Sequence, residues 1–269
     1  MILVFALLGM FFPVGAGLVS AADAGAPAGA ISTGDLVRQM TDLQTLAQFP
    51  DPPYKTTQFS SYDRRSRAPY APNWYANSDG FGREPIPNFL ATIEEPGDDG
   101  VGTYLMADVK GPGAIVRTWT AAINGEVTVT LDGGAEPLYQ GSAAAFLGQT
   151  YSVLAQKAGL IEEPIDEGFR QAQACYFPIA FARSLRIEWR GRLDRVHFYQ
   201  IEVRHYPAGT AVRTFSLEDL STHRAAIAGA LAVLREPHAN FTLPDGGRDV
   251  SFDMTVGPGE RVEAEPLRG

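Results

Sequence analysis

Short β-prone segments separated by turn residues fill the middle of the chain and constrain its fold more than any other feature. Glu126–Leu131 alternates between apolar and polar residues and ends at Asp132-Gly133-Gly134, which is typical of a half-buried strand followed by a turn. The apolar-rich runs 103–109 and 114–120 flank the sequence Lys-Gly-Pro-Gly at 110–113, which predicts a turn between two paired strands. Further strands are predicted at 174–181, 185–189, 196–206, 250–256 and 261–265.

Two helices are predicted outside these strands. The first begins at Ser32, where Asp35 follows three residues later in a capping-box arrangement. Apolar residues then recur at helical spacing until Pro50. The second helix is predicted over 216–234, with Ser216 and Asp219 repeating the capping signal and with Pro237 beyond its end.

The segment 51–100 has no sustained period and is rich in Pro, Gly, Ser, Asn, Tyr and Trp. It is predicted to be a long loop, and long loops within compact domains are often functional.

The many short strands and few helices predict a mainly β fold, an antiparallel jelly-roll β-sandwich with an N-terminal helix and one further helix. A parallel α/β fold is disfavoured because helices do not alternate with the strands. The sequence also has no glycine-rich phosphate loop and no Gly-x-Ser-x-Gly motif. These absences argue against nucleotide chemistry and against a serine-hydrolase triad.

Charge and cysteine content exclude further classes of function. With 22 Lys and Arg against 31 Asp and Glu, the net charge is −9 and no segment forms a basic face, which argues against a nucleic-acid partner. Cys175 is the single cysteine, so a disulfide framework and a cysteine zinc site are excluded. Neither a metal nor a cofactor is expected.

The N-terminus has the pattern of an export signal. No charged residue precedes Asp23, residues 2–12 are almost all apolar, and small residues at 19–22 suit signal-peptidase cleavage. We therefore expect a signal peptide at 1–22 and a linker at 23–31. A buried N-terminal helix is disfavoured, because residues 22–29 are small and linker-like. The predicted location is secreted or periplasmic, without stable membrane insertion after cleavage.

The loop segments 60–64 and 73–80 combine aromatic rings with Asp, Asn and Arg. A sugar site requires such groups, because rings cover the C–H face of a sugar and polar groups bind its hydroxyls. The alternative is a structural loop in which Asp63 and Arg64 form a surface ion pair and Trp74 is a core anchor.

Other clusters favour structural explanations. The acidic run 94–100 is expected to be a solvated turn, since it lacks the ligand spacing of a calcium loop. The acidic residues at 162–167 are expected to be exposed. His197 and His205 lie eight residues apart, too far along a strand to bind one metal, and Cys175 is expected to be a buried core thiol.

Three stretches together resemble one family: residues 60–64 with the Asn-Ser-Asp-Gly stretch at 77–80, the Asp-Val-Lys-Gly-Pro-Gly-Ala-Ile-Val-Arg-Thr-Trp run at 108–119, and residues 176–184. They are similar to motifs of the domain of unknown function 2961 group, which includes glycoside hydrolase family 172. The resemblance runs from about Ile31 to the C-terminus.

The resemblance implies a retaining jelly-roll enzyme that acts on furanosides, such as α-D-fructofuranosides or D-arabinofuranosides. It also implies two jelly rolls per chain and a homotrimer with active sites near subunit contacts, and oligo- or polysaccharides containing furanose units as partners. Rings would stack on the sugar, carboxylates would bind hydroxyls, and the arginine would hold a carboxylate or a hydroxyl. The positions implied near the sugar are Tyr62, Asp63, Arg64, Trp74, Asn77 and Asp79.

One departure from the family concerns the catalytic glutamates. In the family they lie near a Gly-Thr-Glu-Asp-Tyr-Phe-like segment in the second half, and this sequence has no such segment. Residues 261–269 faintly resemble the entry to the 110–113 turn. We therefore expect an N-terminal jelly-roll domain over 32–260, the start of a second roll at 261–269, and a truncated enzyme. A complete one-roll paralogue, or a non-catalytic carbohydrate-binding or structural module, is the alternative.

Overall fold

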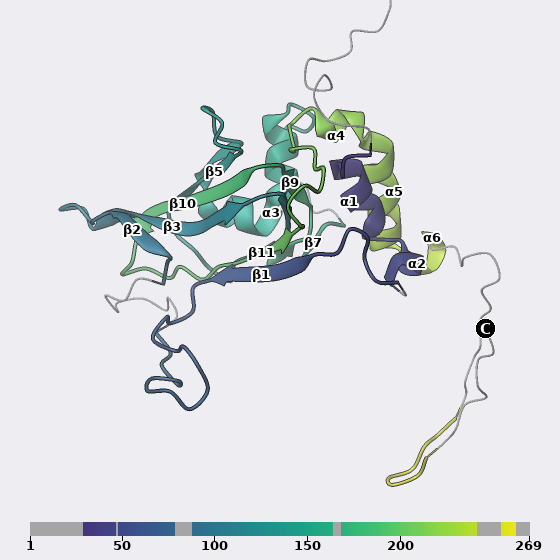
Figure 1. The fold of residues 1–269 in the computed structure, drawn as a ribbon, viewed down its shortest axis with the longest axis horizontal. Helices are drawn as coiled ribbons and strands as arrows, with labels where there is room; N and C mark the ends of the chain where they lie inside the picture. Colours follow the sequence, from purple (N-terminus) through teal and green to yellow (C-terminus); the bar gives the residue numbers. More distant parts are fainter. Residues whose placement is uncertain (1–28, 47, 79–87, 164–167, 241–253, 262–269) are drawn as a thin grey trace, which may run out of the picture.

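A computed structural model describes residues 29–46, 48–78, 88–163, 168–240 and 254–261, and its strands form a sandwich of two antiparallel sheets (Figure 1). The predicted fold class is therefore confirmed. The first sheet has the order β1 (Lys55–Ser60), β11 (Gln200–His205), β4 (Gly113–Trp119), β8 (Ala174–Cys175) and β7 (Arg170–Gln171), with β9 (Ile179–Phe181) also paired to β4. The second has the order β2 (Ala91–Glu94), β3 (Val101–Lys110), β10 (Ser184–Arg192), β5 (Glu126–Leu131) and β6 (Tyr139–Ser142).

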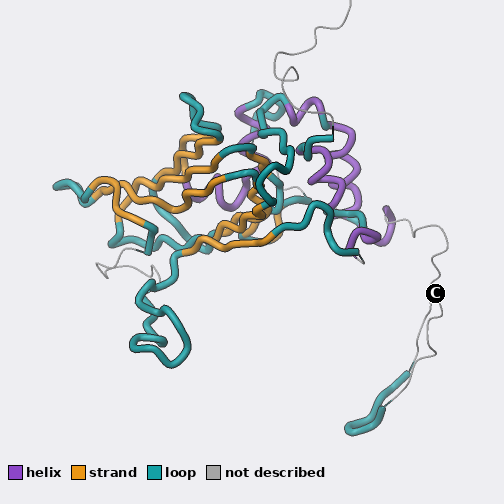
Figure 2. Tube along the Cα trace, in the orientation of Figure 1, coloured by secondary structure: helices purple, strands orange, loops and turns teal. Residues whose placement is uncertain are grey.

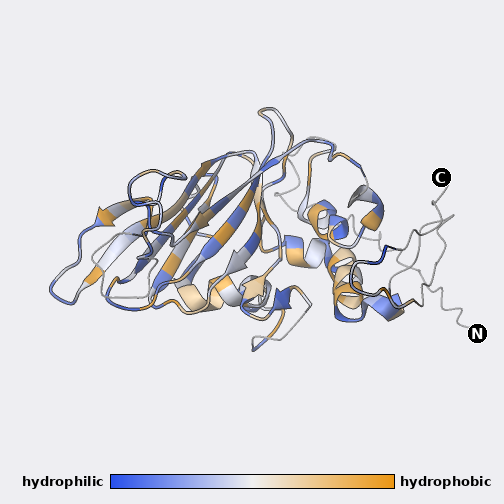
Figure 3. Cartoon of the chain, turned by 90° about the horizontal axis from the view of Figure 1, so that it is seen from below, coloured by the Kyte–Doolittle hydropathy of each residue, from blue (hydrophilic) through white to orange (hydrophobic). Residues whose placement is uncertain are grey.

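The core lies between the sheets, and hydrophobic residues recur along the strands that enclose it (Figure 3). In β5 the apolar positions Val127, Val129 and Leu131 are buried and the intervening residues are not, as the alternation predicts. Phe89 and Trp189 stack at the centre with their ring centroids 4.9 Å apart. Each large side chain buried here stabilises the fold by roughly 1.5–3 kcal/mol.

The turn at 110–113 joins the two sheets, so the prediction that its flanking strands pair with each other is wrong. β3 pairs with β2 and β10, whereas β4 pairs with β11, β8 and β9. Both hydrogen-bonding edges of each strand are thus already occupied. Gly113 allows the crossing, because a Cβ there would lie 2.6 Å from the carbonyl oxygen of Arg204.

A bulge in β4 changes which side chains face the core. Ile115 pairs with Val203 and Arg117 pairs with Glu202, so Val116 is an extra residue. Strict alternation would place Ile115 and Arg117 on one face. In the structure Ile115 is fully buried in the core, while Arg117 lies on the outer face of the first sheet.

The predicted loop at 51–100 contains two strands that the sequence analysis missed. β1 pairs with β11 along its whole length, and β2 pairs with β3. Both are outermost strands in their sheets, and their side chains are mainly exposed. An edge strand with little burial shows no apolar period, which explains why the pattern was not recognised.

The first helix begins as predicted but ends early. In α1 (Thr33–Gln39) the Ser32 hydroxyl accepts from the backbone N–H of Asp35, and the Asp35 carboxylate accepts from the backbone N–H of Ser32. This reciprocal pair confirms the capping box. The chain leaves the helix after Gln39 and forms the short helix α2 (Leu43–Leu46) before Pro50.

A long helix, α3 (Ala143–Lys157), was not predicted, so the expectation of one further helix is wrong. It contacts β5 and β6 of one sheet and β4 and β8 of the other, and Phe146, Leu147 and Leu154 are fully buried. A helix that packs against two sheets is apolar on most of its surface, so it lacks the amphipathic period of a surface helix.

The second predicted helix is divided into α4 (Asp219–Thr222) and α5 (Arg224–Arg235), followed by α6 (Pro237–Asn240). The expected cap at Ser216 does not form, since α4 starts without a side-chain cap. Asp219 instead accepts hydrogen bonds from Thr33 at 2.5 Å and from Arg213 at 2.9 Å. Its carboxylate therefore joins α4 to the start of α1, and α1 also packs against α5 (Figure 2).

Several predictions lie partly or wholly outside the described residues. These are the signal peptide at 1–22, most of the linker at 23–31, residues 250–253 of one closing strand, and all but Arg261 of the second-roll segment. Residues 254–256 are loop, so that part of the predicted strand is wrong. None of the helices in the described ranges is both long and apolar enough to cross a membrane.

Candidate functional site

A cavity of about 410 Å³ lies where the loop 61–78 leaves the end of β1. The loop projects from the sandwich (Figure 1), and the cavity floor comes from neighbouring strands of the first sheet. The residues that line it are Ser60, Ser61, Tyr62, Asp63, Ser66, Ala76, Asn77, Trp119, Ala121, Phe198, Tyr199 and Gln200.

Asp63 organises the base of this loop. Its buried carboxylate accepts from the backbone N–H groups of Arg65 and Ser78, each at 3.0 Å, and from the Arg65 guanidinium at 2.6 Å. The hydrogen bonds from Arg65 hold the pKa of Asp63 well below its usual range, and those from the two backbone groups act in the same direction. Asp63 is therefore a fixed carboxylate that joins the two ends of the loop.

The partner of Asp63 is Arg65, so the alternative ion pair with Arg64 does not form. Asp63 bonds the backbone two residues ahead in an Asx turn, which brings the Arg65 side chain to the same carboxylate. Arg64 instead donates to the carbonyl oxygens of Ser60 at 3.2 Å and Tyr62 at 3.4 Å. Its guanidinium carbon lies 4.8 Å from the Tyr62 ring centroid, which positions that half-exposed ring beside the cavity.

Buried hydrogen bonds connect the cavity wall to the aromatic core. The Tyr199 hydroxyl donates to the carbonyl oxygen of Asn88 at 2.9 Å, and burial raises the pKa of Tyr199 to about 12. The Asn88 side-chain amide donates to the carbonyl oxygen of Ser78, and its Oδ1 lies 3.1 Å from Nε2 of His197. His197 stacks on Phe89 with centroids 5.5 Å apart. The loop is thus anchored through Ser78 to the rigid interior.

The structure brings three of the six predicted site residues to the cavity. Tyr62, Asp63 and Asn77 line it. Arg64 and Trp74 are not among the lining residues, although the Trp74 carbonyl oxygen accepts from Ser66 at 2.6 Å within the loop. Asp79 lies outside the described residues. The proposed roles of all six in sugar binding stay predictions.

Sequence reasoning missed the floor of the cavity. Trp119 and Gln200 are paired across β4 and β11, and both line the cavity. Each lies at the end of its strand nearest the loop. A polar or aromatic residue at a strand end was the sequence signal that could have indicated the cavity floor. The bulge at Val116 made this signal unusable, because the register of β4 could not be assigned from alternation alone.

The cavity can bind a polar ligand but has an incomplete set of groups for hydrolysis. Asp63 is the one carboxyl among the described residues that line it, and its side chain is 1 % exposed. Retaining glycoside hydrolysis uses two carboxyl groups about 5–5.5 Å apart, one of which must exchange a proton. A buried carboxylate with a lowered pKa is poorly suited to donate a proton.

The remaining candidate clusters have structural roles or lie on the surface. Residues 94–99 and Glu162 and Glu163 are exposed, and 164–167 lie outside the described residues. Cys175 is buried, as predicted. His197 is buried and lies before the start of β11, and His205 is half-buried at the end of that strand. The described ranges contain no group of His, Cys, Asp and Glu side chains that is arranged to hold a metal ion.

Comparison with known proteins identifies the domain. Residues 52–223 match the family model described as the GH172 first β-sandwich domain, which is more than half of the 269 residues. The match includes the loop, the cavity and both sheets. No curated protein matches the chain at a significant level. The sandwich and its family match together show that the chain belongs to glycoside hydrolase family 172 and contains the first β-sandwich domain of that family.

Proposed function

We propose that this domain is the sugar-contacting N-terminal part of an exported, retaining glycoside hydrolase that acts on furanosides, of the α-D-fructofuranosidase or D-arabinofuranosidase type. The observation that carries the proposal is the position of the cavity, which lies within the family match and combines a half-exposed tyrosine ring with polar side chains.

The cavity residues have complementary roles in this proposal. The Tyr62 ring covers the C–H face of a furanose, and Arg64 holds that ring in place. The Asn77 amide provides both a donor and an acceptor for ring hydroxyls. Asp63 keeps the loop in shape through Arg65 and Ser78, so it acts on the sugar indirectly.

The catalytic carboxylates are proposed to come from elsewhere. In the family they belong to the second half of the enzyme, and the cavity described here supplies Asp63 alone. We expect hydrolysis to require that second half and a trimeric assembly that brings subunit surfaces to the cavity. Neither requirement changes the sugar-contacting role of the loop.

A non-catalytic carbohydrate-binding module is the second candidate. The commitment of the Asp63 carboxylate to Arg65 and to two backbone N–H groups favours it, because a carboxylate that stabilises its own loop has little capacity left for acid–base chemistry. This candidate predicts binding of the same sugars without a catalytic partner.

A binding titration with matched tyrosine variants tests the sugar site. Short fructan and arabinan oligosaccharides are titrated against the 269-residue chain, and Tyr62→Ala is expected to weaken binding about tenfold through loss of the stacking ring. Tyr75→Ala is the control, because Tyr75 is on the same loop, is 89 % exposed and does not line the cavity. Equal binding by wild type and Tyr62→Ala would reject the sugar site.

An activity assay separates the two candidates. The chain is incubated with aryl fructofuranosides and aryl arabinofuranosides, alone and in a longer form that adds a second β-sandwich. Hydrolysis by the longer form alone supports the enzyme proposal. Hydrolysis by the 269-residue chain would show that carboxyls within it suffice, and inactivity of both forms would favour the binding module.

A further inference from the structure

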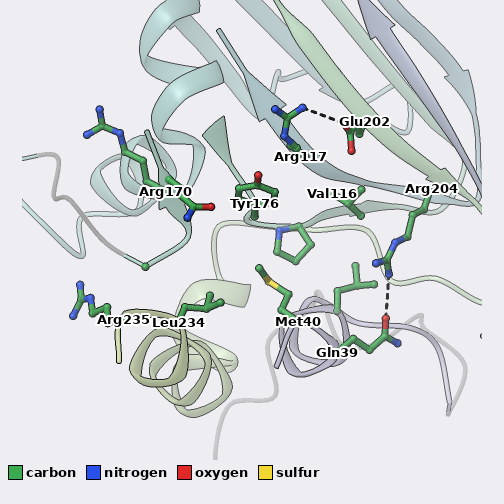
Figure 4. Close-up of a pocket in the computed structure, with 14 residues that line it drawn as sticks. Gln39, Met40, Val116, Arg117, Arg170, Tyr176, Glu202, Arg204, Leu234 and Arg235 are labelled. Atoms are coloured by element: carbon green, nitrogen blue, oxygen red, sulfur yellow. Dashed lines mark hydrogen bonds and ion pairs between the residues drawn. The ribbon is translucent and has the colours of Figure 1, made fainter. Parts of the chain in front are cut away.

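A second and larger cavity, of about 860 Å³, lies between the outer face of the first sheet and helices α1 and α5 (Figure 4). Arginines from four different elements line it: Arg117 of β4, Arg170 of β7, Arg204 of β11 and Arg235 of α5. Glu202 is the one carboxyl among the described lining residues. The described lining residues therefore sum to three net positive charges, in a protein whose net charge is −9.

The fold concentrates these arginines on one face by two devices. The bulge at Val116 turns Arg117 outward, and the period of β11 puts Arg204 on the same face as Glu202. Arg235, in the last turn of α5, approaches from the other side of the cavity (Figure 4). Arginines from separate elements thus line one space.

Two of the arginines keep unused hydrogen-bonding capacity toward the cavity. Arg204 donates to the neutral Gln39 amide at 3.2 Å and lies over the Tyr54 ring at 4.5 Å, but no carboxylate in the described ranges pairs with it. Arg235 is exposed and makes no hydrogen bond or ion pair with the described residues. A guanidinium has five N–H donors, so both can bind an added anion.

The middle of the cavity is apolar. Val116, Met40 and Leu234 line it, and the Tyr176 ring is 36 % exposed. Arg204 lies on one side of Tyr176 and Arg235 on the other (Figure 4). This arrangement, with cations at separate positions and an apolar surface between them, matches a ligand whose anionic groups are held apart by a ring or a carbon scaffold.

We propose that this cavity binds a small organic molecule that carries two or more carboxylate or phosphate groups on a ring or apolar scaffold. Arginine forks match both oxyanions in bidentate geometry. The volume falls in the usual range of ligand sites, roughly 300–1,000 Å³. The proposal does not depend on the furanosidase function. The two cavities are nonetheless adjacent, since Arg117 donates to Gln200 of the smaller cavity at 2.9 Å and to Glu202 of the larger at 3.0 Å.

Calorimetric titration of the 269-residue chain tests the proposal. Trigalacturonate supplies carboxylates, inorganic triphosphate supplies phosphates, and maltotriose is the neutral control. At least one anion is expected to bind, with an affinity that falls as salt rises, and maltotriose is expected not to compete with it. Tighter binding of trigalacturonate would identify a carboxylate ligand, and tighter binding of triphosphate a phosphate ligand.

Charge-matched variants locate the binding. Arg204→Gln and Arg235→Gln are each expected to weaken anion binding about tenfold, as the loss of a charge-assisted hydrogen-bonding group predicts. Arg190→Gln is the control, because Arg190 is an exposed residue of β10 in the other sheet and its loss changes the net charge equally. Arg235 is exposed, so its variant is expected to fold, which circular dichroism and the unfolding midpoint check.

Three results would overturn the proposal. The first is no binding of either anion by the folded chain. The second is binding that Arg204→Gln and Arg235→Gln leave unchanged. The third is an equal loss of binding in Arg190→Gln, which would indicate attraction to the overall charge and not to this cavity.

Discussion

The two cavities on the outer face of the first sheet differ in how their charged side chains are paired. In the smaller one, the single carboxylate of Asp63 is buried and matched by Arg65 and by backbone N–H groups. In the larger one, the described lining residues include four arginines and one glutamate, and Arg204 and Arg235 have no carboxylate partner in the described ranges. The charged group of the smaller cavity is thus paired within the protein, whereas two arginines of the larger cavity have no carboxylate partner among the described residues.

This difference indicates what each charge does for the protein. A buried, fully bonded carboxylate stabilises local structure, and its removal leaves donors without acceptors. Arginines at the surface that have no carboxylate partner contribute little to stability and remain available to a ligand. Substitution of Asp63 in the smaller cavity should therefore affect folding, whereas substitution of Arg204 or Arg235 in the larger one should affect binding.

The largest effect is expected for Asp63→Ala. The change removes the acceptor for the Arg65 side chain and for the backbone N–H groups of Arg65 and Ser78, so the free energy of unfolding should fall by about 3 kcal/mol. Urea unfolding measures this loss. Asp108→Ala is the control, because the Asp108 side chain is 54 % exposed and pairs with Arg186, and its loss should cost less than about 1 kcal/mol. Equal costs in the two variants would show that Asp63 does not anchor the loop.

The same carboxylate predicts an acid-sensitive contribution to stability. Because the hydrogen bonds from Arg65 lower the pKa of Asp63 in the folded state, the stabilisation is fully present above the unfolded value of about 3.9 and is lost as the pH falls through the lowered folded value. Between about pH 6 and about pH 2, wild type should lose more unfolding free energy than Asp63→Asn, and the gap between them should narrow in acid. Parallel pH profiles would contradict this assignment.

A smaller effect is expected for Tyr199→Phe in the cavity wall. The variant leaves the buried carbonyl oxygen of Asn88 without its donor, which should cost about 1–2 kcal/mol of unfolding free energy. Tyr75→Phe removes a hydroxyl from a ring that is 89 % exposed and should have no measurable effect. If both variants are equally stable, the buried bonds between the loop and the core contribute nothing to stability.

The fold was predictable where burial imposes a period. β5 shows the alternation of its sequence because one face of the strand is buried, and the capping box at Ser32 depends on residues three apart. α3 was missed because it contacts both sheets, and β1 because it is an exposed edge strand. The turn at 110–113 was recognised, but the sheet to which each flanking strand belongs depends on contacts distant in sequence.

The site was less predictable than the fold, because cavities depend on register. The loop composition pointed to Tyr62, Asp63 and Asn77, which do line the smaller cavity. Asp63 pairs with Arg65 and not with Arg64 because of an Asx turn. Composition does not reveal such a turn. The larger cavity was not predicted at all. Its residues Arg117, Arg204 and Arg235 are brought together by a bulge, a strand and a helix that are far apart in the chain.

The smallest change in stability is expected for Glu202→Gln, and it tests the comparison most directly. The ion pair between Arg117 and Glu202 is partly exposed at 3.0 Å, so its loss should cost less than about 1 kcal/mol. The same variant removes the one carboxylate among the described residues that line the larger cavity, and binding of trigalacturonate or triphosphate should strengthen about threefold to tenfold through reduced repulsion. Loss of a carboxylate thus destabilises the fold at Asp63 but favours a ligand at Glu202. A large stability loss in Glu202→Gln without tighter anion binding would show that the charges of the larger cavity stabilise the fold, as Asp63 does in the smaller one, and do not serve a ligand.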